Sequence, residues 1–333
     1  MVSDTTPAGM RPSVWSASWL RDYGIYLALI VLIAFFSLRV PEFRTADNAL
    51  LILLQVSVIG IIAIGMTFTI ITAGIDLSVG SLLAIAGVMS ALFAQQEPTA
   101  INVLLALMVP IVIGTLGGIL NGAIIAGAGV NPLIVTLGTL TAFRGFVVWF
   151  RVNPIYDLQP WYRFVGQGTV LGIPVPVLVF AAIAVAAWIV LSYTRFGRYV
   201  YAVGGNREAA RAAGINVGLV TFAVYVISGF CVGIASLVYT SRIMAAQATS
   251  GQGFELQAIA AVVLGGASLF GGRGKISNTI VGALIMGILF NGFVMLDVPQ
   301  PIQQMAVGVI IIVAVWVDGV LRKRRRTSRA RGR

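Results

Sequence analysis

Histidine is absent from this sequence of 333 residues, and cysteine occurs once, as Cys231. The lack of histidine excludes the side chain most often used for proton transfer near neutral pH and for binding metal ions. A single cysteine excludes a disulfide framework and a cysteine-based metal site, and its place in an apolar run predicts a small buried side chain. An enzyme would need a cluster of nucleophile, base or metal ligands, and no such cluster is evident.

Charged residues are also scarce. They make up 10% of the chain, against about 25% in an ordinary soluble domain, whereas 59% of the residues are hydrophobic and the mean hydropathy is +0.97. This composition predicts an all-α integral membrane protein. At about 20 residues per span, the chain has room for about ten transmembrane helices and for no sizeable soluble domain.

The apolar runs place a membrane domain at 23–321, between an N-terminal tail at 1–22 and a basic C-terminal tail at 322–333. Asp76 and Glu255 stand at the starts of the third and eighth spans, so these two helices are expected to be broken or tilted. The ten predicted spans lie at 23–38, 49–73, 77–95, 101–126, 132–150, 173–193, 217–241, 256–270, 276–296 and 302–321.

The basic residues predict how the chain is oriented. Ten spans put both termini on one side of the membrane. Assigning both tails, the loop 194–216 and the turn 273–275 to the cytoplasm gives that side 16 of the 22 Lys and Arg residues. Cytoplasmic loops carry such an excess. The eight positive charges of the C-terminal tail are therefore interpreted as a topology signal that also attracts anionic lipid, rather than as a nucleic-acid site.

A weak internal repeat runs through the spans. GIDL at 74–77 resembles GFEL at 253–256, and GILNG at 118–122 resembles GILFNG at 287–292. Asn131-Pro132 is likewise echoed by Gln300-Pro301. The copies are five spans apart, so they enter the membrane from opposite sides. Inverted repeats are common in transporters, although helices rich in small residues can also resemble each other by chance.

The longest polar interruption is the loop 194–216, which is rich in arginine and alanine. Asn206 is suited to cap a short helix that runs through Ala213, and Gly214 is suited to end it. The loop therefore predicts a small, exposed, cationic helix between two spans.

Several polar residues lie within or beside the spans. Asp76 is expected to accept a hydrogen bond from the amide of Ser78 or Val79 as an N-cap, and a carboxylate in the membrane can also line a polar path. Glu255 is expected to do the same from the opposite side. Side-chain amides can bind hydroxyl groups of an uncharged cargo, or they can join helices. The amides considered are Gln55, Asn121, Asn131, Asn291, Gln303 and Gln304.

Motifs for nucleotide binding are missing. The run GGRGK at 271–275 resembles part of a phosphate-binding loop, but Leu269 stands where the first glycine belongs, and Ile276 stands where Ser or Thr belongs. The chain is therefore expected to bind no cofactor and not to hydrolyse ATP by itself.

Four separated segments together resemble the ribose-type permeases of bacterial ABC monosaccharide importers, and the resemblance covers about residues 23–321. The segments are GIDLSVGSLLA at 74–84, NPLIVTLGTL at 131–140, VGGNREAARAAGI at 203–215 and VVLGGASLFGGRG at 262–274. Within the third segment, Glu208, Ala209, Ala210 and Gly214 resemble the EAA-x-x-x-G signature of importer permeases.

The resemblance implies a dimer of like or unlike permease subunits in the bacterial inner membrane, a periplasmic sugar-binding protein, and a separate ATPase that uses ATP and Mg²⁺. It also implies that the helix near 206–213 docks on that ATPase, and that Asp76 and Ser78 belong to the path or its gate. The residues expected to couple the two proteins are Gly205, Asn206, Arg207, Glu208, Ala209, Ala210 and Gly214.

Other transport functions stay open at this point. A secondary transporter or facilitator would also use inverted repeats, but it would have no need of a docking helix. A related ABC permease could carry nucleosides or branched-chain amino acids. The scarcity of charges in the membrane, which would be needed to bind a carboxylate and an ammonium group, favours a ribose-like pentose or a hexose.

Overall fold

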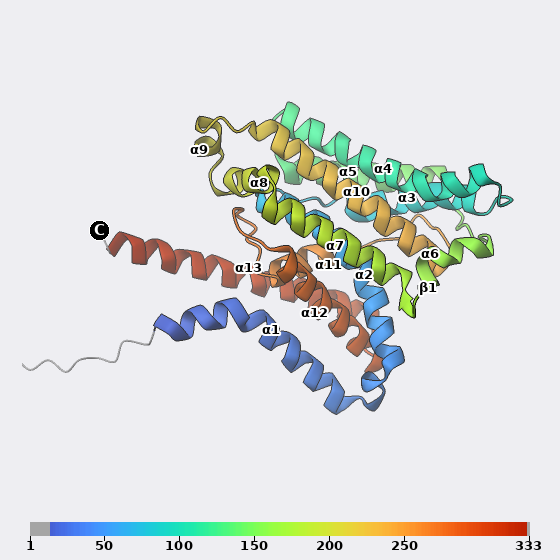
Figure 1. Ribbon diagram of the computed structural model, residues 1–333, viewed down its shortest axis with the longest axis horizontal. Helices are drawn as coiled ribbons and strands as arrows, with labels where there is room; N and C mark the ends of the chain where they lie inside the picture. Colours follow the sequence, from blue (N-terminus) through green and yellow to red (C-terminus); the bar gives the residue numbers. More distant parts are fainter. Residues whose placement is uncertain (1–13, 332–333) are drawn as a thin grey trace, which may run out of the picture.

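The computed structural model describes residues 14–331, and side-chain contacts are described for residues 24–316. The ends of the predicted tails, 1–13 and 332–333, lie outside the described residues, as do the side chains of the basic C-terminal tail. The described chain is almost entirely helical (Figure 1). Its long helices are α1 (Val14–Arg39), α2 (Ala46–Ile71), α3 (Val79–Ala94), α4 (Ala100–Gly127), α5 (Pro132–Phe150), α7 (Val175–Tyr193), α10 (Val217–Ile243), α12 (Ile276–Met295) and α13 (Gln300–Arg331).

Shorter elements join the long helices. They are η1 (Pro41–Arg44), η2 (Pro160–Tyr162), α6 (Arg163–Gln167), α8 (Arg195–Gly205), α9 (Arg207–Ala212), α11 (Phe254–Leu264) and the strands β1 (Thr169–Val170) and β2 (Ile173–Pro174). The two strands pair in antiparallel fashion. The all-α prediction is therefore confirmed except for this small hairpin.

Within the described part of the chain, six helices are long and apolar enough to cross a membrane, namely α2, α4, α5, α7, α10 and α12. Four further apolar segments are shorter: Gly24–Arg39, α3, α11 and Gln300–Trp316. At 1.5 Å per residue, the 16 residues of α3 extend about 24 Å and the 11 residues of α11 about 17 Å, against a hydrocarbon core of about 30 Å. Neither α3 nor α11 alone is long enough to cross it.

The helices lie roughly parallel to the long axis of the molecule (Figure 1). α10 is central, because it packs against α4, α2 and α3, while α12 packs on α2, α11 and α1. Close packing of α4 on α10 depends on glycine. A Cβ added at Gly118 would overlap the carbonyl oxygen of Tyr225, and one added at Gly114 would lie 2.5 Å from the amide of Gly233. Small residues let membrane helices approach in this way.

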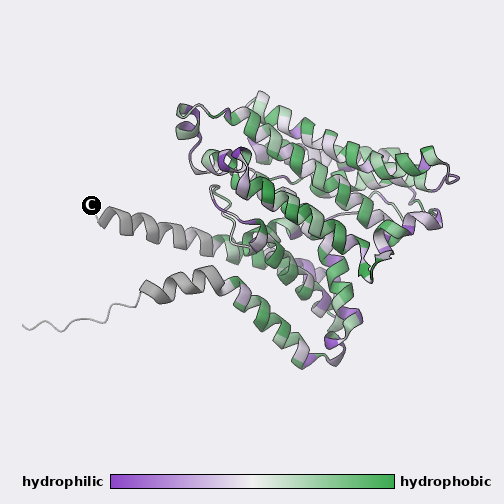
Figure 2. Cartoon of the chain, viewed as in Figure 1, coloured by the Kyte–Doolittle hydropathy of each residue, from purple (hydrophilic) through white to green (hydrophobic). Residues whose placement is uncertain are grey.

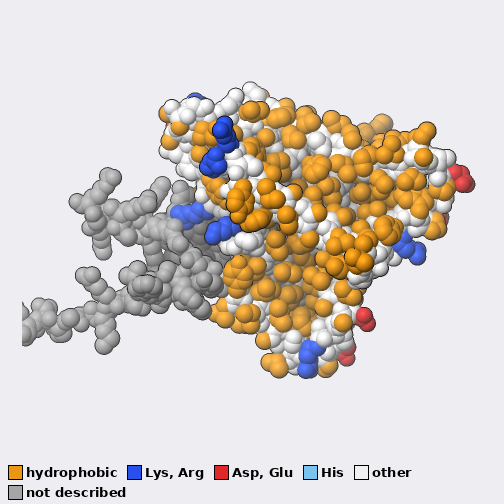
Figure 3. Space-filling view, in the orientation of Figure 1, with side chains coloured by type: hydrophobic (Ala, Val, Ile, Leu, Met, Phe, Trp, Pro, Cys, Tyr) orange, Lys and Arg blue, Asp and Glu red, His pale blue; other side chains and the backbone are white. Residues whose placement is uncertain are grey.

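The outer surface of the bundle is apolar. Figures 2 and 3 show hydrophobic residues over most of the molecule, with several Lys and Arg side chains near the end that carries α8 and α9. Large side chains such as Leu38 and Trp149 are 83% and 78% exposed. Continuous apolar surface of this kind fits a lipid environment, because exposing apolar side chains to lipid carries no free-energy penalty.

The segment 151–174 between α5 and α7 folds onto the bundle. Tyr162 is fully buried, and its hydroxyl lies 2.7 Å from the hydroxyl of Ser90 on α3. Ser241 on α10 donates to the carbonyl oxygen of Tyr162. This segment is thus anchored to the protein through the aromatic side chain of Tyr162.

Candidate functional site

The chain turns back into the molecule after α2. Ala73 has a positive φ of 60°, and residues 72–78 are not helical before α3 begins at Val79. Gly74 is required in this turn, because a Cβ there would lie 2.5 Å from the hydroxyl oxygen of Tyr225 on α10. We call residues 72–78 the first re-entrant segment. Together with the short α3 it forms the broken span that the sequence predicts near Asp76.

Asp76 is fully buried in the first re-entrant segment, and its carboxylate accepts three hydrogen bonds. One oxygen accepts from the amide of Ser78 at 3.1 Å and from the Ser78 hydroxyl at 2.6 Å. The other accepts from the hydroxyl of Ser228 on α10 at 2.8 Å. The predicted bond from the Ser78 amide is confirmed, but the N-cap residue of α3 is Ser78 rather than Asp76. The bond to Ser228 had no signal in the sequence, because the two residues are 152 positions apart.

Other polar groups hold the first re-entrant segment in place. Asn121 on α4 donates its amide to the Ser78 hydroxyl at 2.8 Å, while the amide oxygen of Asn121 is buried with no partner among the described residues. The carbonyl of Ile75 accepts from the hydroxyls of Thr136 on α5 and Tyr225, at 3.1 and 3.3 Å. The structure thus brings Asp76, Ser78 and Asn121 together, as one network over α3, α4 and α10.

A second re-entrant segment follows α10 at residues 244–253. It begins at Met244 and ends at Gly253, which have positive φ values of 51° and 83°. α11 then starts inside the molecule. The carboxylate of Glu255, in its first turn, lies near the backbone amides of Gly253 and of Glu255 itself. Glu255 therefore stands at the start of α11 much as Asp76 stands before α3.

The start of α3 meets the second re-entrant segment at glycine. A Cβ added at Gly80 would overlap the carbonyl oxygen of Gly251 and the carboxylate of Glu255. Arg144 on α5 donates to the carbonyl of Ser250 at 3.0 Å and interacts electrostatically with Glu255. The N-terminal ends of α3 and α11 therefore come together. Both ends carry partial positive charge, which gives the two carboxylates a physical reason to lie there.

Two of the amides considered, Asn131 and Asn291, form hydrogen bonds outside the network around Asp76. Asn131 is exposed, and its side-chain oxygen accepts from the amide of Leu133 at 2.9 Å as the N-cap of α5. Asn291 on α12 is buried and donates to the side-chain oxygen of Asn48 on α2 at 2.7 Å. The structure does not bring either residue to the network around Asp76, and Asn291 joins two helices.

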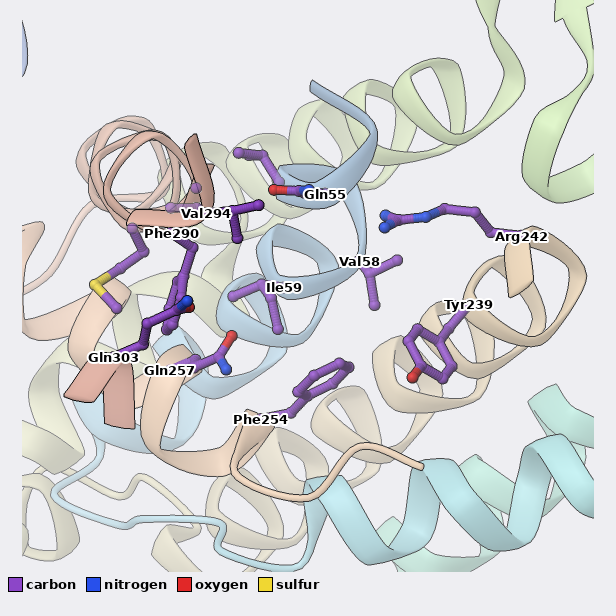
Figure 4. A pocket seen from close by; sticks show the side chains of 14 residues that line it. Gln55, Val58, Ile59, Tyr239, Arg242, Phe254, Gln257, Phe290, Val294 and Gln303 are labelled. Carbon is purple, nitrogen blue, oxygen red and sulfur yellow. The ribbon is translucent and has the colours of Figure 1, made fainter. Parts of the chain in front are cut away.

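The glutamines separate into two groups. Gln55 on α2 and Gln303 on α13 line a cavity in the other part of the bundle, between α2, α10, α11, α12 and α13 (Figure 4). Gln304 is exposed and is absent from the lining of that cavity. Gln257 on α11, which the sequence did not single out, lies in the lining as well.

The polar loop after α7 forms two helices rather than one. α9 is the predicted helix: Asn206 accepts from the amide of Ala209 at 3.0 Å as its N-cap, and Gly214 has the left-handed φ of 80° that ends it. α8 precedes it and was not predicted. Val200 and Val203 of α8 are buried at a helical spacing that could have revealed it.

α8 and α9 are bonded to the first re-entrant segment and to the loop that follows α11. Arg207 donates to the carbonyl of Thr72 at 3.3 Å, at the start of the first re-entrant segment. Tyr201 donates to the carbonyl of Gly274 at 2.7 Å, in the loop that follows α11. Burial raises the pKa of the Tyr201 phenol, so it keeps the proton that it donates.

Close backbone contacts complete this junction. The amide of Gly272 donates to the carbonyl of Ile71 at 2.8 Å. A Cβ at Gly204 would overlap the same carbonyl oxygen, whereas a Cβ at Gly205 meets no atom within 4 Å. The steric constraint thus falls on Gly204, one residue before the glycine that the sequence singled out.

On the outward side of α9, the side chains are exposed rather than packed against the first re-entrant segment or the loop after α11. The side chains of Glu208 and Arg211 are 84% and 68% exposed and form an ion pair at 3.6 Å. Ala209 is also exposed, while Ala210 is buried against the bundle. Glu208 is therefore available to a partner.

Comparison with known proteins identifies the chain. A family model described as branched-chain amino acid transport system, permease component, matches residues 48–315. The ribose import permease protein of Haemophilus influenzae is 44% identical over 91% of this chain and 94% of its own length. The D-allose transport system permease protein of Escherichia coli is 38% identical over 94% and 96%, and the fructose import permease protein of Rhizobium meliloti is 35% identical over 90% and 85%.

No solved structure gives a significant match. The family match covers most of the chain, and the relatives that match nearly its full length are all permease proteins rather than enzymes. The re-entrant segments, the apolar surface and the exposed α9 thus belong to a transport subunit: this chain is a member of the family of branched-chain amino acid transport system permease components.

Proposed function

We propose that this chain is the transmembrane permease of an ATP-driven importer that moves a monosaccharide, such as a ribose-like pentose or a hexose, into the cell. A periplasmic binding protein delivers the sugar, and a separate ATPase supplies the energy. The observation that carries the proposal is the junction of α8 and α9 with Thr72 and Gly274. A partner that moves this exposed pair displaces the start of the first re-entrant segment and the loop after α11 at once.

Sugar is the cargo that the relatives favour. Relatives that match at least 90% of the chain are named for ribose, D-allose, xylose and fructose, although the family description names branched-chain amino acids. An amino acid would need an anionic and a cationic site in the path. The carboxylate of Asp76 is instead fully occupied by hydroxyl and amide donors.

A ten-span topology with cytoplasmic termini is part of the proposal. The ten apolar helices each overlap one predicted span, and the two that are too short are each preceded by a re-entrant segment. α8, α9 and the end of α13 lie at one end of the molecule, opposite α6 and β1 (Figure 1). That end contains most of the 16 basic residues assigned to the cytoplasm.

An inverted repeat accounts for the two broken spans. The first re-entrant segment follows α2 and the second follows α10, and these helices run toward opposite ends of the proposed topology. Asp76 and Glu255 then occupy matching positions. Broken helices of two inverted halves that meet inside the membrane are a common way to form a path with two gates.

A second permease subunit is expected to pack on α5. Gly138 and Gly145 lie one above the other on its exposed side, and a Cβ at either would meet no atom of this chain within 4 Å. Small residues on an uncovered membrane helix favour helix association. The rest of the apolar surface contacts lipid.

Reconstitution tests this function. The chain is placed in proteoliposomes with its ATPase, and the binding protein is added outside with labelled ribose, allose, xylose or fructose. Uptake of at least one sugar is expected to require ATP and both partners. A secondary transporter would instead take up sugar in an ion gradient without the ATPase, and that result would overturn the proposal.

A further inference from the structure

A cavity of about 230 Å³ lies between α2, α10, α11, α12 and α13, away from the network around Asp76. Most of its lining is apolar, and its polar groups come from three glutamines, a tyrosine and an arginine. They are Gln55, Gln257, Gln303, Tyr239 and Arg242. An apolar cavity with a few converging polar groups is typical of a binding site for a small molecule.

The glutamine side chains have unused hydrogen-bonding groups. The amides of Gln55 and Gln257 make no hydrogen bond to any described residue, although both side chains are partly buried. Gln303 donates to the carbonyl of Val298 at 2.8 Å, which leaves its amide oxygen without a described partner. Half-buried amides lose hydration without compensation, so a ligand with hydroxyl groups would be favoured beside them.

Arg242 adds a donor that no acid neutralises. Its guanidinium group donates to the carbonyl of Leu54 at 3.0 Å, and among the described residues no carboxylate lies within 4.0 Å of it. Figure 4 shows this group extending into the cavity from the side opposite Gln257 and Gln303. The planar guanidinium presents several N–H groups in a fixed arrangement, which suits two neighbouring hydroxyl oxygens.

Aromatic rings complete the wall. Tyr239 and Phe254 meet edge to face, with ring centroids 5.4 Å apart, and both line the cavity. An aromatic ring accepts the C–H face of a sugar while the hydroxyl groups on the rim of the sugar reach polar neighbours.

From these contacts we propose that the cavity binds an uncharged monosaccharide within a single permease subunit. The inference rests on the proposed sugar import and adds a resting place for the cargo. The lining supplies only one cation, Arg242, while its other polar groups are uncharged amides and a phenol, which suits a neutral ligand. An amino acid is disfavoured because the lining holds no carboxylate for its ammonium group.

The test uses the full chain in nanodiscs with cysteine introduced at the cavity. Val294 lines it and is 61% exposed, so Val294→Cys should react with N-ethylmaleimide. The imported sugar at saturating concentration is expected to slow this reaction at least threefold. It should not slow the reaction of Leu171→Cys, which lies on a loop and is 98% exposed. The native Cys231 is buried, and the unmodified chain supplies the background rate.

A second substitution identifies the polar groups responsible. Gln257→Leu, placed in the Val294→Cys chain, keeps the size of the side chain and is expected to remove the protection. Gln96→Leu, a matched change at an exposed glutamine after α3, should leave the protection intact. Protection that survives Gln257→Leu would overturn the inference, and so would a rate that responds to anionic lipid in the nanodisc but not to sugar.

The uptake assay separates this inference from the proposed function. If the reconstituted importer moves a monosaccharide but that sugar gives no protection at Val294→Cys, the cavity is not its binding site while the function stands. If none of the tested monosaccharides is imported, the proposed function fails, and the inference fails with it.

Discussion

A carboxylate inside a membrane domain needs donors that replace its water. Asp76 has three, from Ser78 and Ser228, and they come from two different helical regions. The acid therefore joins the first re-entrant segment to α10 in addition to capping a turn. A residue with this role fixes where the broken span bends, which is a structural requirement for any gate at that point.

Replacing Asp76 with alanine is expected to destabilise the protein. Asp76→Ala leaves the hydroxyls of Ser78 and Ser228 buried without their acceptor, at a cost of about 3 kcal/mol in the free energy of unfolding. Asp47→Ala, at an exposed position in the first turn of α2, should cost less than about 1 kcal/mol. Thermal unfolding in detergent compares the two variants. Equal losses in the free energy of unfolding would show that the hydrogen bonds of Asp76 stabilise the protein no more than an exposed acid does.

A single methyl group at Gly204 should disturb the junction with α2. The Cβ of Gly204→Ala would overlap the carbonyl oxygen of Ile71 and lie 2.7 Å from the amide of Gly272, so α8 must move away. ATP-driven uptake per assembled complex is expected to fall about tenfold, which is about 1.4 kcal/mol. Gly127→Ala, where a Cβ meets no atom within 4 Å, is the control. Normal uptake by Gly204→Ala would mean that the contact is not needed.

At the scale of elements, α8 and α9 act as one unit. They are joined to the start of the first re-entrant segment through Arg207 and to the loop after α11 through Tyr201. Inside the molecule, α3, which follows the first re-entrant segment, meets the second re-entrant segment, which precedes α11, where Gly80 contacts Gly251. A displacement of the helix pair therefore has two continuous routes to the place where the broken spans come together.

Reversing the charge on α9 should break the contact with the ATPase without harming the fold. Glu208 is 84% exposed, so Glu208→Lys is expected to change the free energy of unfolding by no more than about 0.5 kcal/mol. Co-purification of the ATPase and ATP-driven uptake should both be lost. Glu97→Lys, at an exposed turn after α3, is the matched control. If the ATPase binds Glu208→Lys as tightly as the unmodified chain, α9 is not the docking element.

Long apolar runs made most helices predictable, because their period and length decide where a span lies. The runs at 132–150 and 217–241 correspond to α5 and α10 almost to the residue. The helix ends were less predictable where polar residues continue the helix: α1 begins at Val14 and α13 continues to Arg331. Apolar content marks the membrane, but helix formation does not stop at its boundary.

The candidate site was only partly predictable for a different reason. Asp76 and Asn206 make local hydrogen bonds that their neighbours in sequence already suggest. Gly204 contacts Ile71, and Gln257 shares a cavity with residues of four other helices, all far away in the chain, and a single sequence contains no signal for such pairs. The helical spacing of the apolar residues in α8 is hard to recognise, because it extends over only a short run between two polar segments.

At the scale of the whole molecule, the proposed topology can be tested with single cysteines. Leu171 lies on the loop joining β1 and β2, and Arg211 lies on α9, so the two positions should face opposite sides of the membrane. In intact cells, an impermeant maleimide is expected to label Leu171→Cys but not Arg211→Cys. Opening the membrane should make Arg211→Cys react as well.

The unmodified chain provides the control for this labelling, because Cys231 is 3% exposed and packs against Gly65 inside the bundle. It should stay unlabelled in both conditions. The charge distribution makes the expected orientation clear: cytoplasmic loops attract Lys and Arg, and the side that holds α9 receives 16 of 22. Labelling of Arg211→Cys from outside intact cells would show that the molecule has the opposite orientation in the membrane. In that orientation α9 could not meet an ATPase in the cytoplasm.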